Sequence, residues 1–267
     1  MELSDILRCP KTGKRLRFDR ASAVVRVEGS DITYPIVDGI VDFLTGTCDR
    51  VSASYDRIAP RYDGVLARPT LLQRILNWII WGSGDDNAYI DAVLSYLPSQ
   101  FEGVLLDVPV GTGVFTSPVY KRHPNATIVA VDSSMGMLRR AKREFERQGV
   151  RNVHLIRADV AHLPLADAAV DMVLSMNGWH AFPEKQRAIA EIRRVLCTDG
   201  RLIACGYVKG DSRRSDFFVE HFAVRRGYFS LPLFEVGELA SQFAGFTIGR
   251  QGTGRCVAYV EARKTET

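Results

Sequence analysis

Two glycines and an acid stand at a spacing that suits a nucleotide-type ligand. The stretch Val104–Phe115 reads VLLDVPVGTGVF, in which Gly111 and Gly113 mark a turn, and Asp132 follows downstream. Glycines let a backbone approach a ligand closely, and the start of the next helix offers unpaired N–H groups. An acid at the end of the next strand can accept two hydrogen bonds from a ribose diol. These residues therefore predict a site for a ribose-bearing ligand.

The residues after the glycines argue against two common nucleotide sites. A phosphate-binding loop needs a Lys followed by Ser or Thr after its last glycine, whereas Val114 and Phe115 stand there. A dinucleotide fingerprint has a third glycine at the position that Thr116 occupies here. The ligand is therefore expected to be neither a simple nucleoside triphosphate nor a dinucleotide.

Short apolar runs that alternate with amphipathic segments predict the elements that position these residues. The expected strands cover 104–106, 127–131, 153–157, 169–176 and 200–207, and the expected helices cover 114–122, 183–196 and 236–243. A further helix ends at Gly149 and carries the apolar stripe Met137, Leu138, Ala141 and Phe145. This order predicts a doubly wound α/β fold, in which parallel strands bring the glycine turn and Asp132 to one sheet edge.

The pattern D-x-x-x-G-x-G after a strand resembles the first motif of Rossmann-like S-adenosylmethionine (SAM) methyltransferases. The later run EIRRVLCTDGRLI resembles that family's helix–turn–strand signature. The resemblance covers roughly residues 50–263 and is closest to the ubiquinone/menaquinone-biosynthesis group, type 11. It implies a mostly parallel seven-stranded sheet with helices on both faces, SAM as the methyl donor and S-adenosylhomocysteine as the product.

The resemblance also implies which residues bind the cofactor. An acid at the position of Asp159 receives the adenine amino group in this family. Pro109 replaces the family's first glycine; it fixes φ and removes one N–H, so cofactor contacts there are expected to differ. The expected cofactor-binding residues are Tyr55, Tyr62, Asp107, Pro109, Gly111, Thr112, Gly113, Asp132, Ser133, Met137, Asp159, Val160 and Asn177.

A tyrosine-rich segment precedes the Rossmann-like part. Tyr55–Asp63 resembles the Y-D-x-x-A-x-x-Y-D segment of the same group, where it forms part of a helical lid and its second tyrosine reaches the methionine end of SAM. The alternative is an amphipathic surface helix with two half-buried tyrosines. We expect a helical lid or linker over residues 48–100 and the SAM-binding domain over 101–267.

Residues 1–47 resemble a small zinc-ribbon-like domain that serves elsewhere as a methyltransferase activator. The phrases LRCPKTGKRL and YPIVDGIVDF carry the resemblance. A structural zinc needs four N or S ligands, and here Thr12 stands where the partner of Cys9 belongs, with Cys48 as the other nearby thiol. We therefore expect no bound metal, and a role in packing on the catalytic domain or shaping its mouth.

Composition is consistent with one sizeable α/β domain and a small appendage. The chain has 267 residues, 46% apolar content, a net charge of +4 and five cysteines, which suggests reduced thiols in the cytoplasm. No signal peptide and no membrane-length apolar run is visible. The basic helix around Arg139 lacks interleaved aromatics and is expected to be a solvated face rather than a nucleic-acid patch. The sequence allows a homodimer.

The sequence says less about the methyl acceptor than about the cofactor. His180, just beyond the fourth strand, is the candidate catalytic base for an acceptor hydroxyl; the alternative is a packing role. The region 209–234 is rich in phenylalanine and arginine and corresponds to the family's acceptor-pocket insertion. It suggests an aromatic or hydrophobic acceptor, with an anionic group as a further option.

Together these features predict a SAM-dependent methyltransferase of secondary or quinone-like metabolism that methylates a small organic acceptor at oxygen or carbon. One alternative is an RNA methyltransferase, because ribosomal-RNA guanine methyltransferases also join a zinc ribbon to this core. Those enzymes keep the Cys ligands that are missing here. The other alternative is a non-catalytic SAM-binding protein or partner subunit.

Overall fold

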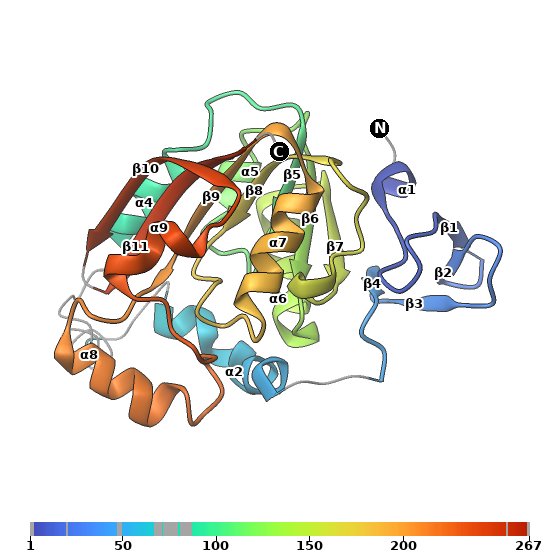
Figure 1. Cartoon of the computed structure of the whole chain (residues 1–267). Helices are drawn as coiled ribbons and strands as arrows, with labels where there is room; N and C mark the ends of the chain where they lie inside the picture. The colour runs from blue at the N-terminus through green and yellow to red at the C-terminus, as the bar shows by residue number, and fades with distance from the viewer. Residues whose placement is uncertain are drawn as a thin grey trace.

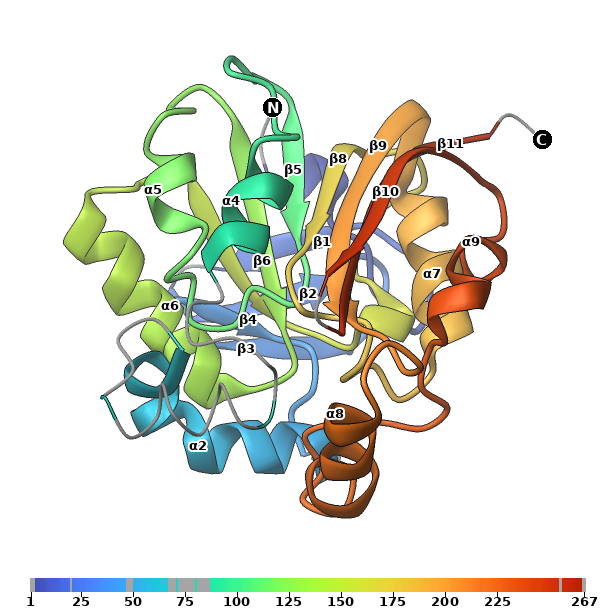
Figure 2. The same cartoon turned by 90° about the vertical axis from the view of Figure 1, so that its left-hand side faces the viewer.

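One continuous sheet runs through the protein, with helices on both of its faces (Figures 1 and 2). The computed structural model describes residues 3–19, 21–46, 50–66, 71, 80, 87–254 and 256–265. In spatial order, the strands are β1 (Leu16–Asp19), β2 (Val24–Val27), β3 (Thr33–Val37), β4 (Ile40–Asp42), β7 (Val153–Arg157), β6 (Thr127–Asp132), β5 (Val104–Asp107), β8 (Val170–Ser175), β9 (Leu196–Tyr207), β11 (Val257–Lys264) and β10 (Phe246–Gly254).

The described sheet has 11 strands, so the expectation of seven is wrong in its count. The run from β7 to β10 contains the strands expected from the Rossmann-like part. Strands β7, β6, β5, β8 and β9 are parallel there, and β11 lies antiparallel between β9 and β10. The additional strands β1 to β4 come from the N-terminal segment, because β4 pairs in parallel with β7 at the open sheet edge.

The N-terminal segment packs closely against the Rossmann-like part. Arg157 pairs with Asp42 at 3.1 Å across the β4–β7 junction, and both side chains are largely buried. The Arg8 amide donates to the carbonyl of Pro164 at 2.9 Å. Leu7 forms an isolated β-bridge with Leu165, and both belong to one hydrophobic cluster. The segment therefore shares a core with the larger unit instead of burying its own.

Of the two N-terminal thiols considered for zinc binding, the structure describes only Cys9. Cys9 is buried, and its Sγ lies 3.2 Å from the hydroxyl of Tyr34. Cys48 lies outside the described residues. Among the residues that the structure does describe, no group of three or more His, Cys, Asp or Glu side chains could hold a metal ion. The zinc-ribbon resemblance and its missing metal both stay predictions.

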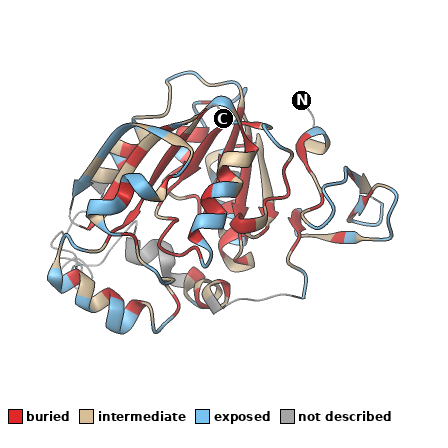
Figure 3. Cartoon of the chain, in the orientation of Figure 1, coloured by how far each residue is buried: buried red, intermediate tan, exposed pale blue. Residues whose placement is uncertain are grey.

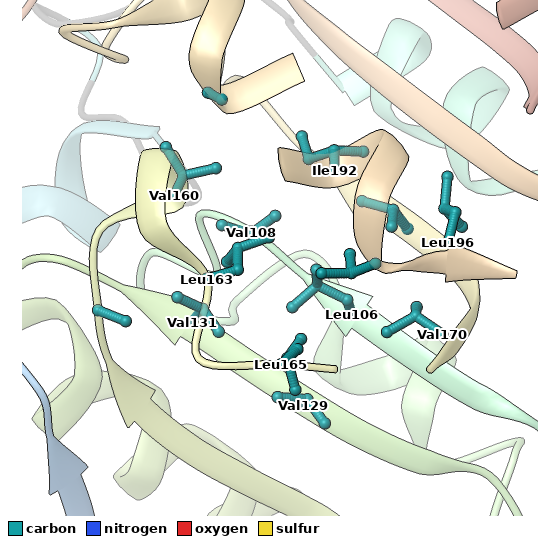
Figure 4. Close-up of a cluster of buried hydrophobic side chains, with 14 of the residues drawn as sticks. Leu106, Val108, Val129, Val131, Val160, Leu163, Leu165, Val170, Ile192 and Leu196 are labelled. Carbon is teal, nitrogen blue, oxygen red and sulfur yellow. The ribbon is translucent and has the colours of Figure 1, made fainter. Parts of the chain in front are cut away.

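Alternating side chains of the central strands build two separate cores. Leu106 and Val129 belong to the buried cluster that also contains Ile192 of α7 (Lys185–Val195), and Figure 4 shows Val129 beside Leu165. Leu105 and Ile128 point to the opposite face and pack with residues of α6 (Met135–Gln148). Burial of such a side chain contributes about 1.5–3 kcal/mol, and Figure 3 shows buried residues concentrated along the strands. The two cores hold the strand ends in fixed positions.

Helix α6 follows β6 and has well-defined ends. The Ser134 hydroxyl accepts a hydrogen bond from the Met137 amide at its N-terminus, and Gly149 adopts a left-handed φ of 74° at its C-terminus. The predicted apolar stripe Met137, Leu138, Ala141 and Phe145 is buried. These caps and this stripe are the features from which the sequence predicted the helix.

The remaining helices are shorter than the sequence suggested or lie at the strand ends. They are α1 (Leu3–Ile6), α2 (Arg50–Leu66), α4 (Asn87–Leu94), α5 (Ser117–Tyr120), α8 (Arg213–Phe218), a π-helical turn (Val219–Ala223), a 3₁₀ turn (Val236–Glu238) and α9 (Leu239–Gln242). Helix α5 covers only part of the expected 114–122, because Pro118 permits a helix start but not a preceding helical turn. Figure 2 shows α2 and α8 at the same end of the molecule. None of the described helices combines the length and the apolar composition needed to cross a bilayer.

Candidate functional site

A cleft of about 990 Å³, open solvent at its mouth included, lies at the carboxyl ends of β5, β6, β7 and β8. The cleft lies where an open α/β sheet is expected to bind ligands. Its lining includes most of the predicted cofactor-binding residues: Tyr55, Pro109, Gly111, Thr112, Gly113, Asp132, Ser133, Met137, Asp159, Val160 and Asn177.

Of the predicted residues that the structure describes, Asp107 does not line the cleft. The side chain of Tyr62 lies outside the described residues, so its contact with the cofactor stays a prediction. Asp107 is fully buried beneath the glycine turn, and its Oδ2 accepts a hydrogen bond from the Tyr120 hydroxyl at 2.6 Å. Burial raises the pKa of Asp107 to about 7. Its place suggests support of the turn rather than direct contact with a ligand.

The glycine turn is tied directly to the acid of the next strand. Gly111 and Gly113 adopt positive φ values of 58° and 68°. The Gly111 amide donates to Oδ2 of Asp132 at 2.9 Å, and the Ser134 amide donates to Oδ1 at 2.9 Å. Each carboxylate oxygen can accept about two hydrogen bonds, so each keeps capacity for one hydroxyl of a diol.

Burial raises the pKa of Asp132 to about 6, although the amides of Ser134 and Gly111 oppose the shift. The nearby carboxylate of Asp56 raises this pKa further. The raised pKa means that ionised Asp132 reduces fold stability: stability is greatest below the usual carboxyl pKa and falls as pH rises through about 6. A ligand that donates hydrogen bonds to the carboxylate would offset this loss.

SAM affinity is therefore expected to depend on the ionisation of Asp132. Only the carboxylate form offers full acceptor capacity, so binding should weaken by about tenfold as pH falls from about 7 to about 5. Isothermal titration calorimetry across this range measures the effect. The Asp132→Asn variant is the control, because its affinity should not change with pH through this group. An unchanged affinity in the wild type across the range would contradict the assignment.

The opposite wall of the cleft suits an adenine ring. Asp159 follows β7, and its Oδ1 accepts a hydrogen bond from the Ala161 amide at 2.9 Å. Met137, Ala158 and Val160 supply apolar surface beside it. The cleft also holds a buried Thr112 hydroxyl that has no hydrogen-bond partner within the described part of the chain. An apolar wall, a carboxylate and a spare hydroxyl are groups that SAM can use, so the residues fit this cofactor.

Helix α2 closes one side of the cleft and is anchored to α6. Val51 and Tyr55 line the cleft from this helix. Asp56 Oδ1 accepts hydrogen bonds from the Gly136 amide at 2.8 Å and from the Ser134 hydroxyl at 2.5 Å. A carboxylate at the N-terminus of α6 is electrostatically favourable. Sequence analysis included Asp56 in the lid motif but did not predict that it anchors α2 to α6. Its position next to Tyr55 in that motif was the only feature that pointed to it.

The loop after β8 forms the floor opposite α2. Asn177 adopts a positive φ of 53°, and its side-chain Nδ2 donates to the Tyr89 hydroxyl at 2.8 Å. A Cβ at Gly178 would collide with the Pro109 ring and with the Ser175 hydroxyl. Gly178 therefore accommodates the proline that replaces the family's first glycine, a relation that sequence analysis missed because the two residues lie on different strand ends.

His180 does not line the cleft, although the neighbouring residues Ala181 and Phe182 do. Its ring stacks on Phe229 with centroids 4.3 Å apart, and Nδ1 accepts a hydrogen bond from the Tyr207 amide at 3.4 Å. Burial lowers the pKa of His180 to about 3, and Lys185 lowers it further. These contacts favour the packing alternative over the base.

Residues 105–200 match the family described as a methyltransferase domain. A malonyl-[acyl-carrier protein] O-methyltransferase of Geobacter sulfurreducens is 36% identical over 139 residues, which are 48% of this chain and 51% of that protein. A demethylmenaquinone methyltransferase of Thermus thermophilus is 33% identical over 114 residues, or 43% of this chain and 50% of that protein. The chain thus matches about half the length of these curated relatives.

The fold is shared with solved methyltransferase structures. A SAM-dependent methyltransferase from Aquifex aeolicus has a TM-score of 0.56 at 17% identity, over 82% of this chain and 100% of that chain. Residues 105–200 thus match a methyltransferase domain, and the chain has the α/β methyltransferase fold. The similarity to named methyltransferases is in keeping with a SAM-dependent enzyme. The predicted α/β fold is confirmed, and the prediction of a SAM-dependent methyltransferase agrees with these matches.

Proposed function

We propose that the protein transfers the methyl group of SAM to a small organic acceptor at oxygen or carbon. The observation that carries the proposal is the glycine turn held to Asp132 in a cleft at the carboxyl ends of the parallel strands. The named functions of the relatives, methylation of malonyl-[acyl-carrier protein] and of demethylmenaquinone, are in keeping with oxygen or carbon acceptors.

The chain's own residues bind and orient in this proposal. SAM, when bound, supplies a methyl group that its sulfonium already activates. Asp132 would hold the ribose, Asp159 the adenine amino group, and Tyr55 would close the cleft from α2. Phe182 and Pro183, in the loop between β8 and α7, line the cleft and would exclude water from the acceptor. Rate acceleration then rests on proximity and orientation.

The test combines binding and transfer. Calorimetry with SAM and S-adenosylhomocysteine should show specific binding, and isotope-labelled SAM should transfer its methyl group to a member of a panel of phenols, carboxylic acids and quinone precursors. Transfer to bulk RNA, with the steep salt dependence of phosphate contacts, would favour the RNA methyltransferase alternative. Tight SAM binding without transfer to any acceptor would favour a non-catalytic protein.

His180→Gln is expected to leave kcat within about threefold of the wild type, because a ring with a pKa near 3 is a weak base. The variant should lose about 1–3 kcal/mol of unfolding free energy, since the ring stack and a buried hydrogen bond are lost. Urea unfolding measures the stability, and NMR of the imidazole protons should show no titration of His180 near neutral pH.

The base role makes the opposite prediction. If His180 deprotonates an acceptor hydroxyl, the same variant should lose about 10²–10⁴-fold in kcat with intact SAM binding. The wild-type rate would then rise with pH through a histidine pKa. Either result would overturn the packing assignment.

A further inference from the structure

A second cavity opens beside the cofactor cleft and is lined mainly by arginine. Its lining residues are Ser54, Arg57, Arg225, Arg226 and Tyr228. Ser54 and Arg57 come from α2, and the others follow the π-helical turn of the 209–234 insertion. None of the described lining residues is acidic. Three guanidinium groups around one hollow repel each other and create a field that attracts anions.

Among the residues that the structure describes, two of these arginines have no carboxylate partner, unlike Arg157 and Arg201. Arg157 pairs with Asp42, and Arg201 pairs with Glu261. By contrast, no carboxylate in the described part of the chain lies within 4.0 Å of the Arg57 or Arg226 guanidinium. Each keeps a planar set of N–H donors, which matches the oxygens of a carboxylate or phosphate.

The cavity has a fixed position relative to the cofactor cleft. The Ser54 hydroxyl donates to the carbonyl of Arg226 at 2.7 Å, which ties the two walls of the cavity together. Tyr55, the next residue of α2, lines the cofactor cleft, and its hydroxyl donates to the Tyr228 carbonyl at 3.3 Å. The ring centroids of Tyr55 and Tyr228 lie 6.2 Å apart. The cavity and the cleft are therefore adjacent, with Tyr55 on the cleft side and Tyr228 on the cavity side.

We propose that the cavity binds an anionic group of the methyl acceptor, a carboxylate or a phosphate, through Arg57 and Arg226. The proposal rests on the proposed methyltransferase function, because that function makes the neighbouring cleft the site of transfer. An acceptor anchored by its anion would extend past the tyrosine pair toward the cofactor. Recognition would thus combine a charged end in the cavity with an apolar body beside Tyr55 and Tyr228.

The experiment uses the full chain labelled with ¹⁵N and follows the arginine Nε–Hε resonances. The variants Arg57→Gln and Arg226→Gln assign the two signals. The probes are inorganic phosphate, benzoate and its uncharged counterpart benzamide, with sodium chloride at matched ionic strength. Both assigned signals should shift saturably with phosphate, benzoate or both, and not with benzamide or chloride. A response to benzoate alone identifies a carboxylate as the preferred group, and a response to phosphate alone identifies a phosphate.

The double variant Arg57→Gln/Arg226→Gln should weaken the anion response by about tenfold, since two charge-assisted contacts are lost. Its matched control is Arg143→Gln, which removes an exposed arginine of α6 away from the cavity lining. Glutamine is shorter than arginine, but it keeps the aliphatic stem, remains polar and carries no charge. Calorimetry should give a SAM affinity for the double variant within about twofold of the wild type, because neither arginine lines the cofactor cleft.

These readouts separate the two proposals. If the wild-type protein does not bind SAM, the methyltransferase function is refuted, while the anion measurement remains valid. The anion cavity would be refuted if phosphate and benzoate shifted the arginine signals no more than chloride does. It would also be refuted if Arg143→Gln weakened the anion response as much as the double variant does. Neither result would affect SAM binding. A response to a short RNA and to neither small anion would also overturn the proposal, in favour of a nucleic-acid surface.

Discussion

Asp132→Ala is expected to weaken SAM binding by about 30-fold or more. The carboxylate can accept two hydrogen bonds from the ribose diol, and charge-assisted contacts of this kind contribute roughly 2–3 kcal/mol. The geometry adds a second reason, because Asp132 also accepts the amides of Gly111 and Ser134 at 2.9 Å each. Removal of the carboxylate therefore releases the glycine turn as well as the ribose. Calorimetry with SAM gives the change in affinity.

The control for this variant is Asp171→Ala. Asp171 Oδ2 accepts a hydrogen bond from the Val104 amide at 2.7 Å, at the end of β5 that is remote from the cleft. The control therefore removes a carboxylate from a backbone amide of the same sheet without touching the cofactor. Its SAM affinity should stay within about twofold of the wild type. A wild-type affinity in Asp132→Ala, or an equal loss in Asp171→Ala, would show that Asp132 does not bind the ribose.

The central strands, and the cleft where most of the predicted cofactor-binding residues gather, follow from local signals in the sequence. Runs such as Thr127–Asp132 are apolar over the length of a strand, and glycines and acids punctuate their ends. The fold then brings these ends together by a general rule of parallel sheets. Residue type and position along the chain are sufficient for this part of the site.

Features that depend on long-range pairing could not be predicted in this way. Val41 pairs with Ile156 across the β4–β7 junction, and no local pattern specifies that partner. The environment of His180 depends on Phe229, which belongs to the 209–234 insertion. A residue at a strand end can point into a cleft or away from it, and only the packing of a distant segment decides between them. The arginine cavity likewise joins α2 to that insertion.

Gly113→Ala is expected to destabilise the protein by about 2–5 kcal/mol and to disrupt the cofactor cleft. A positive φ of 68° costs an L-residue about 1–2 kcal/mol. A Cβ at this position would also lie 2.8 Å from Cζ of Phe145. That ring is buried and packs against Tyr120, with centroids 6.0 Å apart, so it has little room to move. Overpacking of this kind costs about 1–3 kcal/mol.

Gly111→Ala separates the two causes, because Gly111 has a similar φ of 58° and no atom within 4 Å of its hypothetical Cβ. This variant should lose only the conformational cost, about 1–2 kcal/mol, and it keeps the amide that donates to Asp132. Urea unfolding of both variants measures the difference. Equal losses would mean that Phe145 can yield and that backbone conformation alone requires glycine at position 113. A larger loss for Gly113→Ala would show that the second glycine of the turn is required by the packing of Phe145 as well as by its backbone conformation.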